Sequence, residues 1–190
     1  MARFPGRAHL GGVSVIFAFV IVMGYWLYQT VSFGKAALFI EADPEATVYV
    51  NGVEKGKTPL ELEIEEQEVV LQMVASGASP PFATRVALTE GVKTIVRRRF
   101  GESELLGSSQ TISFEKITSN EPEIAIVSIP DGAEVFLDGQ RQGPTPLNLA
   151  PAAGEHTLRL ISAGYKEEEF EIVTIPGLQT TVIVDLAAKP

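Results

Sequence analysis

An internal duplication limits the architecture of this chain more than any other feature of its sequence. Residues 46–77 align with residues 133–164 at a constant offset of 87 positions and without a gap. Eleven of the 32 aligned positions are identical, whereas chance at ordinary composition gives about two. A repeat of this length corresponds to one structural module, so we expect two copies of a single small domain.

Each copy has the sequence pattern of an all-β domain. Apolar and polar residues alternate along residues 60–65, which is typical of a half-buried strand. The pairs Asn51-Gly52 and Asp138-Gly139 have the composition of two-residue hairpin turns. Twelve Pro and 17 Gly indicate frequent turns, and neither copy contains a helical period of adequate length. The predicted class is all-β, with two tandem small β-sandwiches.

The same patterns predict the domain boundaries. The first repeat covers residues 36–100 and the second covers residues 123–188. Residues 101–122 form a linker between them. This linker contains apolar residues that a purely flexible segment would lack, and they predict an extra strand at residues 111–116, laid on one of the domains.

The N-terminal segment has the composition of a membrane anchor. No Lys, Arg, Asp or Glu occurs between Arg7 and Lys35, and residues 10–28 are long enough as a helix, about 28 Å, to cross a bilayer. We expect a transmembrane helix at residues 10–33 behind a cytoplasmic tail at residues 1–9. A cleaved signal peptide is the alternative, although its apolar region usually has only about 7–15 residues.

The flanks of this segment predict its orientation. Arg3 and Arg7 lie at its N-terminal end, whereas Tyr25, Trp26 and Tyr28 lie at the other end, where an aromatic belt is expected. By the positive-inside rule, the N-terminus is cytoplasmic in a single-pass protein of a bacterial inner membrane. The two repeats then lie in the periplasm or outside the cell.

The residues after the anchor are acidic and poor in catalytic groups. After position 34, 13 Lys and Arg oppose 24 Asp and Glu, and this net charge of −11 disfavours nucleic acid. The chain has no Cys, and His9 and His156 fall on opposite sides of the expected membrane. The Glu clusters at 61–68 and 167–171 are interpreted as solvated strand faces rather than metal sites. We therefore expect no enzyme activity, metal or cofactor.

The triplet Arg97-Arg98-Arg99 is a basic cluster in this acidic region. Three adjacent cations could contact a partner protein or lipid phosphates. They could equally protect an edge strand against aggregation. Both interpretations of Arg97, Arg98 and Arg99 stay open at this point.

A set of turn and strand residues recurs at matching places in the two repeats. The second repeat carries the fuller set: Pro130, Asp131, Gly132, Ala133, Val135, Asp138, Gly139, Gly143, Thr145, Pro146, Gly154, Glu155, His156, Gly164 and Tyr165. The first repeat keeps Asn51, Gly52, Gly56, Thr58, Pro59 and Gly77, but it has Ala78 in place of the tyrosine. Together these residues resemble the PEGA domain family over about 130 of the 190 residues.

The resemblance implies a small sandwich of bacterial surface and envelope proteins, without catalytic residues. Together with the expected anchor, it favours a scaffold or accessory subunit of a respiratory, photosynthetic or secretory membrane complex. Its partners would be other membrane-protein subunits and the lipid bilayer. The alternative is a carbohydrate or cell-wall binder, which exposed aromatic platforms would support. Outside the expected anchor the chain has no Trp, and its only Tyr residues are Tyr49 and Tyr165.

Overall fold

A computed structural model describes residues 35–65, 67–77 and 80–190 of the chain. Over these residues the secondary structure consists of fifteen strands and one short 3-10 helix, so the predicted all-β class is confirmed. No helix in this part of the chain is long and apolar enough to cross a membrane. The span expected at residues 10–33 and its flanking residues Arg3, Arg7, Tyr25, Trp26 and Tyr28 lie outside the described residues.

The two repeats contain equivalent strands in the same order. The first repeat comprises β1 (Ala36–Asp43), β2 (Ala46–Val50), β3 (Val53–Lys57), β4 (Leu60–Ile64), β5 (Glu68–Ala75), β6 (Phe82–Ala87) and β7 (Lys93–Arg99). The second comprises β9 (Glu123–Ile129), β10 (Glu134–Leu137), β11 (Gln140–Pro144), β12 (Leu147–Leu149), β13 (Gly154–Ile161), β14 (Glu168–Thr174) and β15 (Leu178–Asp185). Between them lie the 3-10 helix η1 (Glu104–Leu106) and β8 (Ser108–Lys116).

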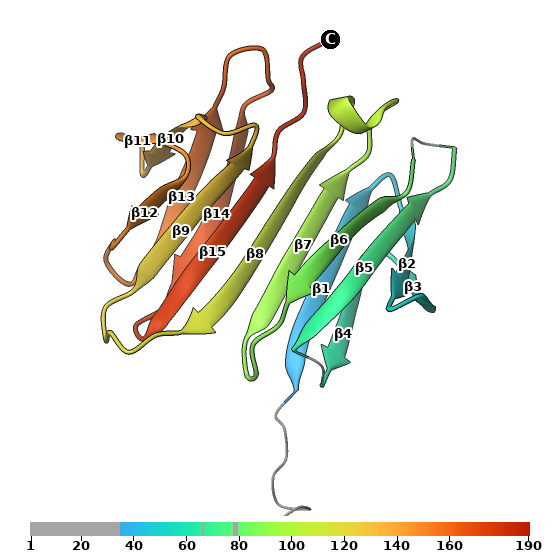
Figure 1. The fold of residues 1–190 in the computed structure, drawn as a ribbon, viewed down its shortest axis with the longest axis horizontal. Helices are drawn as coiled ribbons and strands as arrows, with labels where there is room; N and C mark the ends of the chain where they lie inside the picture. The colour runs from blue at the N-terminus through green and yellow to red at the C-terminus, as the bar shows by residue number, and fades with distance from the viewer. Residues whose placement is uncertain (1–34, 66, 78–79) are drawn as a thin grey trace, which may run out of the picture. The chain divides into compact units, whose positions relative to one another are not determined.

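These strands form three sheets, one of which is shared by both repeats (Figure 1). The shared sheet has seven strands in the order β12-β9-β15-β8-β7-β1-β4. The two smaller sheets have the orders β3-β2-β5-β6 and β11-β10-β13-β14. The sequence predicts two separate sandwiches and a strand at residues 111–116 on one of them. Instead, β8 is antiparallel to β7 on one side and to β15 on the other, so it joins both repeats into one sheet.

The shared sheet has an approximate two-fold symmetry about β8. Strand β1 is parallel to β7, and β9 is parallel to β15. Going outward from β8, each half therefore has equivalent strands in the same order and with the same direction. A two-fold axis along β8 relates halves of this kind, and such a rotation also exchanges the two faces of the sheet. The smaller sheets therefore pack on opposite faces of the shared sheet.

The side chains of neighbouring strands agree with this arrangement. Val96 of β7 belongs to the first core, whereas Ile112 of β8 belongs to the second. Successive residues of a strand point to opposite faces. Ile95, adjacent to Val96, accordingly pairs with Ile112 and packs against the second core.

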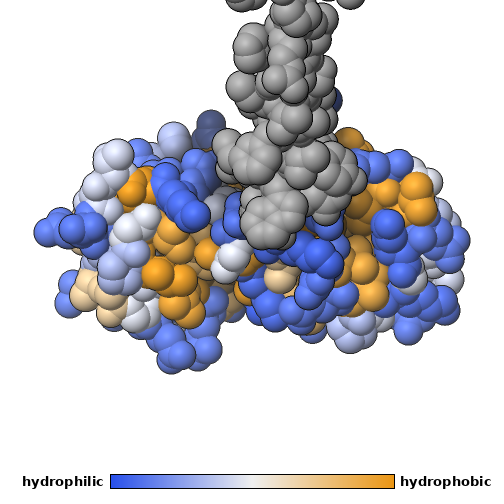
Figure 2. Space-filling model, turned by 90° about the horizontal axis from the view of Figure 1, so that it is seen from below, coloured by the Kyte–Doolittle hydropathy of each residue, from blue (hydrophilic) through white to orange (hydrophobic). Residues whose placement is uncertain are grey.

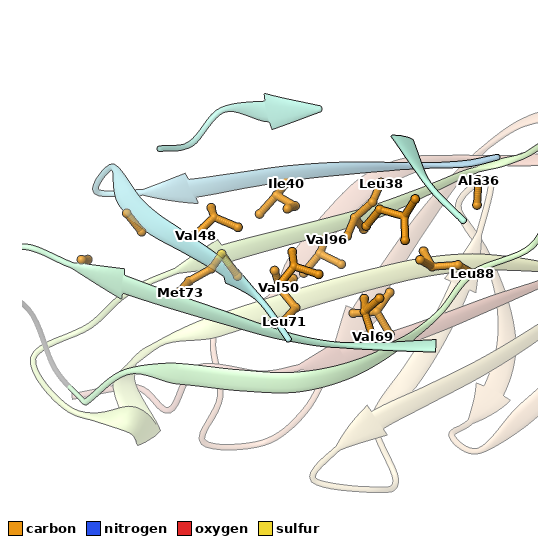
Figure 3. Packing of buried hydrophobic residues seen from close by; sticks show 14 of the residues in the cluster. Ala36, Leu38, Ile40, Val48, Val50, Val69, Leu71, Met73, Leu88 and Val96 are labelled. Atoms are coloured by element: carbon orange, nitrogen blue, oxygen red, sulfur yellow. The ribbon is translucent and has the colours of Figure 1, made fainter. Parts of the chain in front are cut away.

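Each repeat has its own apolar core between its smaller sheet and its half of the shared sheet. Figure 3 shows the first core, in which Leu38 and Ile40 of β1 lie opposite Val48 of β2 and Leu71 of β5. All four side chains are completely buried. Burying a side chain of this size contributes about 1.5–3 kcal/mol, so each core stabilises its repeat.

A buried threonine holds the start of the smaller sheet in each repeat. The Thr58 hydroxyl accepts a hydrogen bond from the backbone N–H of Ala46 at 3.0 Å. Thr145 accepts the equivalent bond from Ala133 at 3.1 Å. The sequence marks these Thr-Pro pairs only as strand breaks, yet their hydroxyls also satisfy buried backbone donors.

Candidate functional site

The three consecutive arginines of β7 lie at the junction of the two repeats, in the interior of the shared sheet. Strand β7 pairs with β1 on one side and β8 on the other, so the edge-protection interpretation of Arg97, Arg98 and Arg99 is wrong. Strand geometry turns Arg98 toward the first core and the other two toward the opposite face. The three cations therefore do not form one exposed basic patch.

Arg98 is buried, with 3% of its surface exposed, and its guanidinium lies against two aromatic rings. The Cζ atom is 4.7 Å from the ring centre of Phe82 and 5.4 Å from that of Phe100, within the range of cation–π attraction. The Nη1 atom is 3.6 Å from Oδ2 of Asp185, at the end of β15 in the second repeat. Arg98 thus connects the first core to the last strand of the second repeat.

Burial dominates the electrostatics of this ion pair. Desolvation lowers the pKa of Arg98, and the attraction of Asp185 opposes the shift. Desolvation likewise raises the pKa of Asp185, against the attraction of Arg98. For both groups, the effect of lost hydration on the pKa is larger than the effect of the opposite charge, as is common for buried ion pairs.

The connection between the repeats leaves room for the Arg98 guanidinium only because residue 107 is glycine. A Cβ atom at Gly107 would lie 2.5 Å from Nη2 of Arg98 and 2.9 Å from the carbonyl oxygen of Arg99. Gly107 has a φ of −92°, which any residue can adopt. The requirement for glycine here is a close approach and not a left-handed backbone.

Arg97 and Arg99 lie on the other face of β7, and each is paired with a carboxylate. Arg97 Nε donates to Glu41 Oε2 at 3.3 Å. Arg99 Nη1 donates to Glu168 Oε1 at 3.3 Å, and Gln110 Nε2 donates to the other oxygen of Glu168 at 3.0 Å. Glu168 belongs to β14, so this second set of contacts also joins the two repeats.

Glu168 differs from the other carboxylates of its cluster. Its neighbours Glu167, Glu169 and Glu171 are exposed, as the interpretation of residues 167–171 as a solvated face predicts. Glu168 is only 4% exposed, so that prediction is wrong at this position. The alternation of β14 indicates this burial, because it places Glu168 on the same side of the strand as the buried Ile172.

Two adjoining clefts lie beside these contacts, and we call them together the junction groove. The first has a volume of about 290 Å³ and is lined by both ends of the Arg97–Glu41 and Arg99–Glu168 pairs. The second, of about 320 Å³, extends along β14 past Glu169 and Glu171. The residues common to both clefts are Arg97, Arg99, Gln110 and Glu168. The second cleft is lined mainly by polar atoms, so it can bind a ligand through charge and hydrogen bonds.

In the described part of the chain, both ring nitrogens of the histidine contact oxygen atoms of the protein. His156 Nε2 donates to the carbonyl oxygen of Ala152 at 2.8 Å, and Nδ1 lies 2.7 Å from Asp138 Oδ2. Since a carbonyl and a carboxylate only accept hydrogen bonds, both ring nitrogens donate when the ring is protonated. The hydrogen bond to Asp138, followed by that to Ala152, raises the pKa of His156. A histidine with both nitrogens engaged has none left to accept a substrate proton.

No group of three or more His, Asp or Glu within residues 35–65, 67–77 and 80–190 is arranged to hold a metal ion. The Glu cluster at residues 61–68 includes Glu61 and Glu63 of β4, which instead form ion pairs with Lys93 at 2.7 Å and Lys35 at 3.1 Å. These carboxylates spread along a strand, as the alternation of residues 60–65 predicts.

Comparison with known proteins yields a family match and a likeness to distant solved structures. The model of the PEGA domain matches residues 36–102 and again residues 121–189. No curated protein matches the chain. A solved structure of the Bacillus anthracis TIE protein is 13% identical and aligns with 82% of this chain at a TM-score of 0.27. The chain spans 34% of the length of that structure.

Proposed function

Because the chain belongs to the PEGA domain family, with one PEGA domain in each repeat, we propose that it is a non-enzymatic scaffold protein held at a membrane. It would act as an accessory subunit of a larger membrane or envelope complex. Its two domains would be displayed outside the cytoplasm on a single N-terminal anchor, and they would work by contact with other subunits.

The double pairing of β8 carries this proposal. Two domains on a flexible linker move independently, whereas a strand that pairs with both makes them one body. The ion pairs of Arg98 with Asp185 and Arg99 with Glu168 add side-chain contacts across the same junction. A rigid double domain holds its binding surfaces at a constant spacing, which suits a scaffold.

The surface of the double domain also supports display in water. On the face that Figure 2 shows, hydrophobic residues gather in separate areas with hydrophilic residues around them. The engaged ring nitrogens of His156 favour a structural role for this residue over a catalytic one. The anchor itself rests on the sequence of residues 10–33, which contains no charged residue.

The proposal is tested on the full-length chain in its native membrane. We expect the protein to remain in the membrane after an alkaline wash and its C-terminal repeats to be digested only by protease added from outside the cytoplasm. Native mass measurement after mild detergent extraction should then give a mass well above 20.5 kDa, with other polypeptides present. A soluble chain with a shortened N-terminus, or a lone monomer that binds cell-wall glycans, would contradict the proposal.

A further inference from the structure

The outer strand of the second repeat's smaller sheet borders the junction groove with an unpaired backbone edge. Strand β14 is the last in the order β11-β10-β13-β14, so one of its two edges has no neighbouring strand among the described residues. The groove runs along this edge past Glu169 and Glu171. Its opposite wall is formed by Arg97 and Arg99 of β7.

The backbone direction of β14 can be read from one hydrogen bond. The carbonyl oxygen of Val173 accepts a bond from the Thr180 hydroxyl at 3.2 Å, and Thr180 lies in β15, away from β13. Backbone groups of alternate residues point to the same edge of a strand. The N–H and C=O groups of Glu171 and Glu169 therefore point toward the groove, where they can pair with an added strand.

The charges around this edge favour a basic ligand. The walls carry two guanidinium groups, those of Arg97 and Arg99, while the Arg98 guanidinium is turned to the other face of β7. Against them stand five carboxylates, from Glu41, Asp43, Glu168, Glu169 and Glu171. The local excess of negative charge attracts cations and repels acidic strands, including those of a second copy of this chain.

The corresponding edge of the first repeat offers a different setting. Strand β6 is likewise the outer strand of its sheet, and Thr94 bonds to Ala87 as Thr180 bonds to Val173. The two bonds are 86 residues apart in the sequence. With this offset, Ala83 and Arg85 of β6 correspond to Glu169 and Glu171 of β14. The β6 edge therefore lacks the acidic side chains of β14.

We propose that the junction groove binds an extended, basic segment of a partner protein, which adds to β14 as a further strand. Main-chain hydrogen bonds to Glu169 and Glu171 would supply the pairing, and the lysine or arginine side chains of the partner would contact the carboxylates of the groove. This inference rests on the proposed scaffold function, since it names the chemistry of a partner.

The test uses the full-length chain in a neutral detergent and two synthetic peptides of about six residues, the usual length of a strand. One peptide alternates Lys with Thr and the other alternates Glu with Thr. Hydrogen exchange at residues 168–174 should slow when the Lys peptide is added, whereas exchange at residues 82–87 should not change. No protection with the Lys peptide, equal protection with the Glu peptide, or equal protection at β6 would overturn the proposal.

Matched variants separate strand addition from general attraction to an acidic protein. The double substitution Glu169→Lys and Glu171→Lys should weaken binding of the Lys peptide by about tenfold or more. Glu54→Lys with Glu90→Lys changes the net charge by the same four units at two exposed positions of the first repeat that line neither cleft, and it should leave binding unchanged. Equal weakening by both variants would mean that overall charge, and not the groove, binds the peptide.

The same variants distinguish this inference from the proposed function. Suppose that the double variant still assembles into a complex of unchanged mass while the Lys peptide fails to bind the native chain. This result would disprove binding at the groove and would not affect the scaffold proposal. A native chain that is a lone monomer would remove the scaffold proposal, whatever the peptides do.

Discussion

The second strand of each repeat ends in a turn with the same backbone and different chemistry. Asn51 and Gly52 have φ angles of 50° and 78°, and Asp138 and Gly139 have φ angles of 51° and 77°. Asn51 Oδ1 accepts the N–H of Val70 at 2.9 Å, and Asp138 Oδ1 accepts that of Thr157 at the same distance. Only the aspartate has a second partner, His156, whose equivalent in the first repeat is the buried Val69.

The junction shows the same separation of backbone and side chain. Asp43 pairs with Arg99 and Ile129 pairs with Asp185, and both Asp43 and Ile129 precede a proline, so Arg99 corresponds to Asp185. By the same register, Arg98 corresponds to Val184. At the junction, the first repeat contributes Arg98 and Arg99, and the second contributes their carboxylate partners Asp185 and Glu168. The glycines and the apolar core residues maintain the same fold in both repeats. The polar side chains at the turns and at the junction differ between the two copies.

The largest effect on this comparison is expected from Arg98. Arg98→Ala removes the contacts with two rings and leaves Asp185 unpaired, which should lower the free energy of unfolding by about 2–3 kcal/mol in urea titrations. The double variant Arg98→Met with Asp185→Val removes both charges together and should recover most of the loss. A loss below about 0.5 kcal/mol for Arg98→Ala would mean that the junction does not depend on this residue.

Gly107 should come next. Gly107→Ala places a Cβ atom against the Arg98 guanidinium and should cost about 1–3 kcal/mol, the usual range for overpacking. Part of this cost should vanish in an Arg98→Ala background, because the clash is then reduced to the backbone of Arg99. Additive costs in the two backgrounds would show that Arg98 does not occupy the space above Gly107.

The hairpin glycines should show where the repeats are alike. Gly52→Ala and Gly139→Ala each force a side chain into a left-handed backbone, at a cost of about 1 kcal/mol. No atom lies within 4 Å of the added Cβ at either site, so the strain alone acts in both repeats. Thermal unfolding of the two variants should give equal losses, and a difference above about 1 kcal/mol would disprove the equivalence of the turns.

The smallest effect should be a pH dependence that the Asp138–His156 pair of the second repeat produces. The pKa of His156 is raised above its ordinary value of 6.5 by the hydrogen bond to Asp138. Its stabilising contribution is therefore complete below pH 6.5 and is lost as the pH rises through the folded-state pKa. The pKa of Asp138 is lowered below 3.8 by His156, so the contribution of the carboxylate is lost on the acid side.

Substitution toward the first repeat tests this difference. His156→Val should reduce stability most between about pH 4 and 6.5 and least at higher pH, as measured by unfolding at a series of pH values. Asp138→Asn, which copies Asn51, should flatten the same profile. Parallel profiles for the native chain and His156→Val would show that the pair does not contribute to folding.

The local features of this fold could be predicted from the sequence, and its long-range pairing could not. The turn at Asn51-Gly52 and the alternation of Leu60, Leu62 and Ile64 are encoded within a few residues. The partners of β8 are not, because the choice between pairing with one repeat and pairing with both depends on residues far away in the chain.

The junction site is hard to predict for a different reason. The run Arg97, Arg98 and Arg99 suggests one basic cluster, although alternate residues of a strand face opposite ways. The alternation Thr94, Val96 and Arg98 already places Arg98 on the core side of its strand. The sequence does not show that two rings and a carboxylate surround Arg98 and make its burial tolerable, since Phe82 and Asp185 come from other strands.

Hydrogen exchange of the individual β8 amides tests the central claim most directly, because alternate residues of this strand bond to β7 and to β15. If β8 joins the two repeats into one body, the N–H groups directed at β7 and those directed at β15 will exchange equally slowly, at the rate of global unfolding. Rapid exchange of every second amide between Ser109 and Ile112, where β8 pairs with both neighbours, would contradict the account, since β8 would then belong to one repeat only.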